Sequence, residues 1–435
     1  MRSHVNTKIM AMASAIVIIL SMFLAGCGSS GSTNSPSKVS ISYWTWAPAI
    51  EIVKKQITAF EKEYPNISVD YKVSTYNDYL VALKAAANAG SLPTVMALQP
   101  VGTGVSVSYL RPLQDFAKSS LGQNWQAKYV KTGLQQARMI NPPGDNNFYA
   151  LPEGMQSTSL VVNTAIFHKY KLPVPQTFSE LEQDAAVLRS HGVAPILLGG
   201  ADGWQNEDLF LEIANQVAPD AWYQAEKAGT GFDAPGLVKA MNIWRSLFTE
   251  HIVQGGAMGA HAYPDEVNAF NKGEGAIIPL GSWAISSTPP GPYNVPLAKE
   301  WQMIQFPKLS ATAQQIPLAG ADAILGMAKS VSGVQADAGW KLIQFLTQGD
   351  GEVIYANEMC DLPAKVGLTP STLPYASAKV MYQQSVDWTK EGTSRYVANP
   401  QLNNALITAL ASVATGQATP AAALSKLDGV AARKQ

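Results

Sequence analysis

The sequence predicts an α/β protein with two lobes, each a mostly parallel sheet flanked by helices. Three observations predict this fold. The chain has 435 residues, 47% hydrophobic and 14% charged, which is too long for one small core and typical of globular proteins. Strand and helix periodicities alternate over residues 39–98. A polar break rich in Pro and Gly follows at 141–147, which indicates the approach to a second lobe.

The N-terminus predicts export and anchoring. Arg2 and Lys8 precede an uncharged apolar run over 9–24, which is short for a membrane span but long enough for a signal-peptide core. It ends in Leu-Ala-Gly-Cys27, which resembles the bacterial lipobox. We therefore predict a lipoprotein signal peptide at 1–27, two acyl chains on Cys27 and a Gly/Ser-rich tether at 28–38. The predicted location is the outer face of the cytoplasmic membrane. The alternative is an ordinary signal peptide with an incidental Cys.

Charge and cysteine content exclude several function classes. Without residues 1–27, which hold two basic and no acidic residues, 29 basic residues face 32 acidic ones, a net charge of −3. A nucleic-acid partner is not expected, because phosphate-binding surfaces need a basic excess. Only Cys360 remains, so no disulfide and no cysteine metal cluster is possible. We expect no cofactor, no metal and a monomer.

The first lobe begins with a strand–helix–strand unit. Apolar residues alternate at 39–43 and again at 67–73, and between them they recur at helical spacing from Ile50 to Phe60. A second helix is predicted over 79–89 and a short apolar strand over 95–98. Ligands of such sheets bind beyond the carboxyl ends of the strands, which here are 44–48, 74–77 and 99–103.

The second lobe is predicted to begin after a crossover strand at 148–152. A capping box at Thr177–Glu180 opens a helix that extends to Ser190, and a buried strand follows at 193–198. Further helices are predicted at about 235–250, 336–347 and 402–415 from their apolar spacing.

Several segments together resemble the extracellular solute-binding family of ABC importers, of the maltodextrin and multiple-sugar binding type. They occur in the family's order: FEKEYPNISV at 60–69, GSLPTV at 90–95, LRPL at 110–113, FYALP at 148–152 with VNT at 162–164, PQTFSEL at 175–181, FNKGEGA at 270–276 with GSW at 281–283, and AGWKLIQFL at 338–346 with LPA at 362–364. Thr94 stands where the family usually has Asp.

This resemblance implies a periplasmic-binding-protein-like fold, in which a hinge joins the two lobes. The chain would cross this hinge more than once. The N-terminal lobe would comprise 39–150 and 308–357, and the C-terminal lobe 151–307 and 358–435. The ligand would be a mono- or oligosaccharide held between the lobes and delivered to the permease subunits of an ABC transporter.

A sugar site needs aromatic platforms and polar groups that bond hydroxyls. Trp46, Trp204 and Trp283 follow predicted strands or glycine turns, and Asp202 lies beside Trp204. The family resemblance places an acid at Glu153 and a glycine-containing turn at Gly320–Asp322. The candidate ligand-binding residues are Trp46, Tyr76, Gln99, Glu153, Gln156, Asp202, Trp204, Trp283, Gly320 and Asp322.

No catalytic residue is predicted, and the protein is expected not to be an enzyme. The five histidines form no H-E-x-x-H pair, and neither a G-x-S-x-G elbow nor a P-loop occurs. A surface glycosidase would need two facing carboxylates, for which Glu153 with Asp202 or Asp322 is the available set. Two binding alternatives stay open: a ligand-binding partner of a membrane sensor, and a binder of another polar solute such as a polyamine.

Overall fold

The computed structural model describes residues 38–101, 105–138, 140–142, 144–286, 300–397 and 399–431. The predicted signal peptide, the lipidated Cys27 and the tether up to Ser37 lie outside these residues. In the described part of the chain, no helix combines the length and the apolar character that a bilayer span requires.

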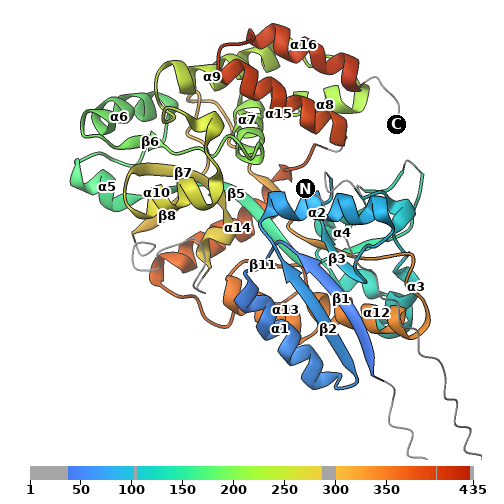
Figure 1. The fold of residues 1–435 in the computed structure, drawn as a ribbon. Helices are drawn as coiled ribbons and strands as arrows, with labels where there is room; N and C mark the ends of the chain where they lie inside the picture. The colour runs from blue at the N-terminus through green and yellow to red at the C-terminus, as the bar shows by residue number, and fades with distance from the viewer. Residues whose placement is uncertain are drawn as a thin grey trace, which may run out of the picture. The chain divides into compact units, whose positions relative to one another are not determined.

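The first sheet has the strand order β2-β1-β3-β10-β4. Figure 1 labels its first three strands, β2, β1 and β3. β1 pairs parallel with both β2 and β3, whereas β10 pairs antiparallel with β3 and β4. Its strands are β1 Val39–Thr45, β2 Ile67–Val73, β3 Val95–Leu98, β4 Ala150–Pro152 and β10 Ile324–Met327. The predicted strand–helix–strand start is therefore present, and a strand from much later in the chain completes the sheet.

Helices and two short 3-10 segments accompany this sheet, and together they form the first lobe. They are α1 Ile50–Glu63, α2 Tyr76–Ala89, η1 Val107–Tyr109, α3 Gln114–Leu121, η2 Trp125–Lys128, α4 Lys131–Ala137, α12 Gly333–Gln348 and α13 Asp350–Met359. One core cluster joins the inner faces of β1, α1 and α12, with Tyr43, Phe60 and Leu342 fully buried. Figure 1 shows α1 and α13 side by side, and α13 packs on α1.

The beginning of α2 differs from the sequence prediction. The helix starts at Tyr76 rather than Tyr79, because the side chain of Thr75 accepts a hydrogen bond from the backbone N–H of Asp78 and caps the first turn. It ends at Gly90, whose φ of 67° suits a residue without a Cβ. The earlier start places Tyr76 and Asn77 in the first turn of the helix.

The second sheet has the order β12-β9-β5-β7-β6, and β8 and β11 also pair with β5. β5 is the long central strand, and all ten of its residues are buried. The strands are β5 Gly154–Asn163, β6 Ala194–Ile196, β7 Gly275–Gly281, β8 Trp301–Ile304, β9 Leu318–Ala321, β11 Leu362–Pro363 and β12 Thr393–Ser394. The predicted strand at 193–198 is β6, and it is shorter than expected.

Helices on this sheet form the second lobe around the largest core cluster. Trp244 of α9 is fully buried and donates its indole N–H to the carbonyl of Leu410 in α15, 3.0 Å away. The helices are α5 Thr164–Lys169, α6 Phe178–Ser190, α7 Trp204–Val217, α8 Ala221–Ala228, α9 Pro235–Thr249, η3 Ala257–Gly259, η4 Ala262–Glu266, α10 Val267–Asn271, η5 Ser282–Ile285, α14 Ala376–Glu391, α15 Pro400–Ala414 and α16 Pro420–Ala431. The predicted capping box of α6 is formed by Thr177 and Glu180.

Within the described residues, the chain passes between the sheets at three places: between β4 and β5, between β9 and β10, and between α13 and β11. Backbone hydrogen bonds tie these crossings together: Glu153 N–H to Ala323 O at 2.9 Å, Asp322 N–H to Gly154 O at 2.9 Å, and Ala364 N–H to Glu153 O at 3.3 Å. We refer to these three segments as the hinge. The lobe boundaries predicted from the sequence stay predictions; β9, within the segment 308–357, pairs with strands of the second sheet.

Two Gly→Ala substitutions are predicted to have opposite effects on stability. A Cβ at Gly154 would lie 2.5 Å from the hydroxyl oxygen of Tyr355, so Gly154→Ala should lower the free energy of unfolding by about 1–3 kcal/mol. Gly429 lies in α16, and a Cβ there would extend into open space, so Gly429→Ala should raise it by about 0.5–1 kcal/mol. Thermal or urea unfolding measures both. A loss of stability at Gly429, or none at Gly154, would contradict this view of the hinge packing.

Candidate functional site

Three predicted residues of the first lobe lie together beyond the ends of its strands. The ring of Trp46 contacts the ring of Tyr76 edge-on, with centroids 5.5 Å apart. The hydroxyl of Tyr76 donates to Oε1 of Gln99 at 2.5 Å. All three side chains are half-buried. The first lobe thus presents an aromatic pair and an amide side by side, as the carboxyl-end rule predicts.

Two predicted tryptophans of the second lobe also meet. The rings of Trp204 and Trp283 are 5.9 Å apart in an edge arrangement. Tyr263, which the sequence analysis did not select, stacks near Trp204 at 6.5 Å, and its hydroxyl accepts the indole N–H of Trp283 at 2.9 Å. Trp283 also packs against a small buried cluster that α1 and α13 of the first lobe form. Trp204 and Trp283 are therefore half-buried neighbours, and Trp283 reaches the other lobe.

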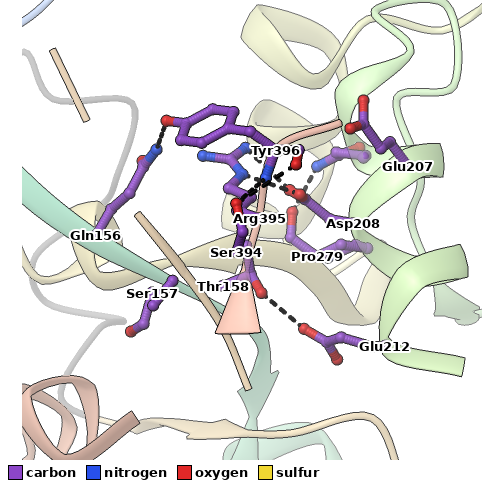
Figure 2. Close-up of polar contacts among 12 residues, drawn as sticks. Gln156, Ser157, Thr158, Glu207, Asp208, Glu212, Pro279, Ser394, Arg395 and Tyr396 are labelled. Carbon is purple, nitrogen blue, oxygen red and sulfur yellow. Dashed lines mark hydrogen bonds and ion pairs between the residues drawn. The ribbon is translucent and has the colours of Figure 1, made fainter. Parts of the chain in front are cut away.

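Arg395 is the charged centre of this aromatic group, and sequence reasoning missed it. Its guanidinium carbon lies 5.1 Å from the ring centroid of Trp283 and 5.5 Å from that of Trp204. Its Nε and Nη2 each donate to Asp208 at 2.9 Å, a bidentate ion pair (Figure 2). Burial opposes the charge, but Asp208, Tyr396 and Asp322 together outweigh the burial and raise the pKa of Arg395. The remaining nitrogen, Nη1, has no hydrogen-bond partner among the described residues.

Tyr396 follows Arg395 and is positioned by two of the predicted residues. The amide of Gln156, in β5, donates to the Tyr396 hydroxyl at 2.8 Å (Figure 2). Gly320 leaves the space that the Tyr396 ring occupies, because a Cβ there would lie 2.6 Å from the ring. The Tyr396 hydroxyl in turn donates to the carbonyl of Ala321, beside the hinge. Gln156 and Gly320 thus act through Tyr396, and the side chain of Gln156 is buried.

Asp322 lies on a hinge crossing. Its half-buried side chain makes no hydrogen bond to a described residue. Burial raises the pKa of Asp322 to about 6, and Arg395 opposes that rise. The carboxylate of Asp322 and the guanidinium of Arg395 therefore lie in the same region of the structure.

Electrostatic interactions connect the two lobes in this region. Burial raises the pKa of the Tyr76 hydroxyl, Arg395 opposes that shift, and Glu207 and Asp322 add to it. These groups interact only because Tyr76 of the first lobe lies close to the second lobe and the hinge. We define the interlobe cluster as Trp46, Tyr76, Gln99, Trp204, Tyr263, Trp283, Asp322, Arg395 and Tyr396.

Glu153 lies in the interior of the hinge and not in the interlobe cluster. Its side chain is 0% exposed; Oε1 accepts a 3.4 Å hydrogen bond from Gln56, and Oε2 has no partner in the described part of the chain. Burial, followed by the charge of Asp322, raises the pKa of Glu153 to about 8. Burial also raises the pKa of Asp361, on the third crossing, to about 8. Each hinge crossing therefore carries one acid: Glu153, Asp322 and Asp361.

Asp202 is occupied by protein donors. Its Oδ1 is 2.6 Å from Nδ1 of His261 and accepts from the amide of Asn77 at 2.8 Å, and its Oδ2 accepts from the backbone N–H of Ala262 at 2.8 Å. The hydrogen bond and the charge of Asp202 raise the pKa of His261. Since three donors already fill this carboxylate, little of it is left for a ligand hydroxyl.

Two cavities of the structure lie away from the interlobe cluster. They have volumes of about 420 and 370 Å³ and adjoin the loop around Ala313 and Gln314, and no residue of the interlobe cluster lines either one. Within the described ranges, no group of three or more His, Cys, Asp or Glu side chains is placed to hold a metal ion. Cys360 is buried there and is not part of a disulfide.

The residues that sequence reasoning missed share one property: they carry no motif. Tyr263 lies in η4, at a position where the backbone is not helical. Arg395 and Tyr396 follow the two-residue strand β12. The one signal in the sequence for these two residues is that they directly follow a short strand. That signal can be recognised only when it is known that this strand, β12, pairs with β9.

Comparisons with known proteins place this geometry in context. A sequence model described as bacterial extracellular solute-binding protein matches residues 46–352. An uncharacterised ABC transporter extracellular-binding protein of Pyrococcus horikoshii is 25% identical over 287 residues, 61% of this chain and 62% of that protein. The glucose-binding protein GlcS of Saccharolobus solfataricus is 35% identical over 100 residues, which are 21% of this chain and 18% of GlcS.

Solved structures extend the similarity to most of the chain. A protein from a study of xylan utilisation by Caldanaerobius polysaccharolyticus has a TM-score of 0.76 at 19% identity, covering 90% of this chain and 100% of its own. A chitin oligosaccharide binding protein has a TM-score of 0.76 at 19% identity, covering 91% and 98%. Maltose-bound MalE3 of T. maritima has a TM-score of 0.71 at 18% identity, covering 90% and 99%. These similarities confirm the predicted two-lobed α/β fold. The prediction that each sheet is mostly parallel was wrong for the second lobe, because its central strand β5 pairs antiparallel with β7, β8, β9 and β11.

The buried hinge acid predicts a pH dependence of stability. The unfolded chain ionises Glu153 near its ordinary pKa of 4.5, while the folded chain keeps it neutral up to about pH 8. Its contribution to stability is therefore complete below pH 4.5 and is lost as the pH rises to 8. Glu153→Gln, which stays neutral, should be more stable than the wild type at pH 9 by an amount on the order of a few kcal/mol, and much less so at pH 5.

Thermal unfolding from pH 5 to pH 9 measures this difference. Asp337→Asn on the exposed face of α12 is the control and should follow the wild type at every pH. If Glu153→Gln ran parallel to the wild type across the range, Glu153 would not titrate in the buried hinge as described.

Proposed function

Because the chain belongs to the bacterial extracellular solute-binding protein family, we propose that it captures a carbohydrate between its lobes and delivers it to an ABC permease. The observation that carries the proposal is the interlobe cluster. Trp204 and Trp283 of the second lobe lie against the guanidinium of Arg395, and Tyr76 of the first lobe interacts electrostatically with Arg395 and Asp322. Nη1 of Arg395 and the carboxylate of Asp322 have no hydrogen-bond partner among the described residues. Sugars offer apolar C–H faces and rows of hydroxyls, which such a combination of groups suits.

The energies that binding requires are within reach of this cluster. A micromolar complex needs about 8 kcal/mol. Stacking contributes about 0.5–1.5 kcal/mol for each ring, and hydrogen bonds to charged groups contribute about 1.5–3 kcal/mol each. Two or three rings together with Asp322 and the free nitrogen of Arg395 can supply that amount.

The position of Arg395 disfavours a polyamine at the aromatic rings. The guanidinium of Arg395 is at the centre of the aromatic group and would repel an ammonium ion bound against Trp204 or Trp283. Another buried acid nearby is already engaged: both oxygens of Glu212 accept hydrogen bonds, one from the hydroxyl of Thr158 and one from a backbone N–H. Proteins of similar fold include a chitin oligosaccharide binding protein and a maltose-bound one, which supports a sugar as the ligand class.

We propose that the protein binds its ligand without turnover. The glycosidase alternative requires two carboxylates that reach a sugar, but Glu153 is fully buried and Asp202 is held by three donors. Incubation with oligosaccharides should yield no new reducing ends. A role as the ligand-binding partner of a membrane sensor would use the same cluster and would be distinguished by the membrane protein that co-purifies.

Calorimetry with xylo-, chito- and malto-oligosaccharides, glucose and spermidine tests the ligand class. We expect one of the sugars, and not spermidine, to bind. Trp283→Ala and Trp204→Ala should each weaken that binding about tenfold or more, and Arg395→Lys should do the same because lysine cannot form the bidentate pair. Trp44→Ala is the matched control, since this half-buried ring lies under Lys72 outside the cluster. Unchanged affinity in the three cluster variants would contradict the site.

We also propose that Cys27 anchors the protein to the outer face of the membrane through two acyl chains. A thioether-linked diacylglycerol supplies the two chains that stable anchoring needs. Growth with an alkyne-labelled fatty acid should label the wild-type protein in the membrane fraction, and Cys27→Ser should abolish the label. Equal labelling of Cys27→Ser would contradict the lipobox prediction.

A further inference from the structure

Asn77 and Asp202 connect the two lobes at a distance from the hinge. Asn77 lies in the first turn of α2 in the first lobe, and Asp202 precedes α7 in the second lobe. The Asn77 amide donates to Oδ1 of Asp202 at 2.8 Å. By contrast, another side-chain bond between the lobes, from Gln136 Nε2 to Ala319 O, lies on β9 directly before the hinge. Among the described residues, the Asn77–Asp202 bond therefore holds the lobes at a different place from the hinge contacts.

The donor is fixed to its lobe before it reaches across. Thr75 caps α2 and sets its first turn, and the next turn is anchored by Tyr79, which is 1% exposed and donates to the carbonyl of Ala97 at 2.6 Å. Asn77 itself is exposed. The capped first turn therefore fixes the backbone from which the Asn77 amide reaches the second lobe.

The acceptor is equally fixed. His261 Nδ1 and the backbone N–H of Ala262 hold the two oxygens of Asp202 at 2.6 and 2.8 Å, and the Asp202 side chain is only 8% exposed. This arrangement depends on Gly199, because a Cβ there would lie 2.1 Å from the backbone nitrogen of Ala262. The glycine pair before Asp202 therefore lets the 261–262 backbone approach and orient the carboxylate.

We propose that Asn77 and Asp202 form a latch that stabilises the closed arrangement of the lobes in the absence of ligand. Asp202, which the sequence analysis assigned to the ligand, would instead bind the opposite lobe. The inference rests on the proposed function only in that the lobes open and close. The latch would raise the fraction of molecules that are competent to bind, and the apparent dissociation constant depends inversely on this fraction.

A negative charge introduced at the donor gives the sharpest test. Asn77→Asp places one carboxylate against another, while the first turn of a helix still favours an acidic residue, so α2 should fold normally. We expect the ligand-free full-length protein to shift to an open arrangement, seen as a larger radius of gyration in small-angle X-ray scattering. The shift should shrink in about 1 M salt, which screens the repulsion. Asn77→Ser removes the amide without adding charge and should lower the ratio of closed to open molecules about three- to tenfold.

Two further variants make the assignment specific. Asn77→Asp combined with Asp202→Asn restores a donor and an acceptor across the lobes and should return the radius toward the wild-type value. Asn242→Asp is the matched control, because the Asn242 amide makes an exposed 2.8 Å bond to Val238 within a single helix; it should leave the radius unchanged.

Scattering from Asn77→Asp and Asn77→Ser that is identical to the wild type would overturn the latch. So would an equal expansion in Asn242→Asp, or a swap that fails to restore the wild-type radius. Since no ligand is present, these outcomes leave the carbohydrate proposal untouched, and a failure to bind any sugar leaves the latch untouched.

Discussion

The arrangement of the site depends on the way three chain crossings are held together around Glu153. The backbone N–H of Glu153 bonds to Ala323, its carbonyl accepts from Ala364, and Asp322 bonds back to Gly154. These bonds join the three hinge segments into one narrow strip. The strip lies between the two sheets, each of which has its own hydrophobic core. A strip of this kind can flex by small dihedral changes while each core stays packed, which is how hinge motions arise.

That strip also determines which groups face one another. Asp322 lies on it, Gln156 and Gly320 lie on the strands that leave it, and both hold Tyr396 in place. Next to Tyr396, Arg395 is held by Asp208 under the rings of Trp204 and Trp283. The first lobe supplies Trp46 and Tyr76 from the end of β1 and the start of α2. The site is thus assembled from segments far apart in the sequence, which the hinge brings together.

Sequence reasoning predicted the parts of this structure that local periodicity specifies. The alternation around β1 and β2 and the helical spacing of α1 predicted the first lobe, and the ordered motifs predicted the family that the comparisons then confirmed. Trp46, Trp204 and Trp283 were selected because they follow predicted strands or glycine turns, and their role in binding stays a prediction. Arg395 and Tyr396 were not found, since their position depends on β12 pairing with β9. The roles given to Glu153 and Asp202 depended on tertiary partners, Gln56 for one and His261 with Asn77 for the other, that no spacing rule reveals.

The central claim is that an uncharged sugar binds among the aromatic rings between the lobes. A crystal structure of the protein with the sugar that calorimetry identifies tests it most directly. We predict a sugar ring against Trp204 or Trp283, with hydroxyls within hydrogen-bond distance of Asp322 and of Nη1 of Arg395. Density for the sugar in a cavity beside the loop at Ala313 and Gln314, with the interlobe cluster empty, would contradict it.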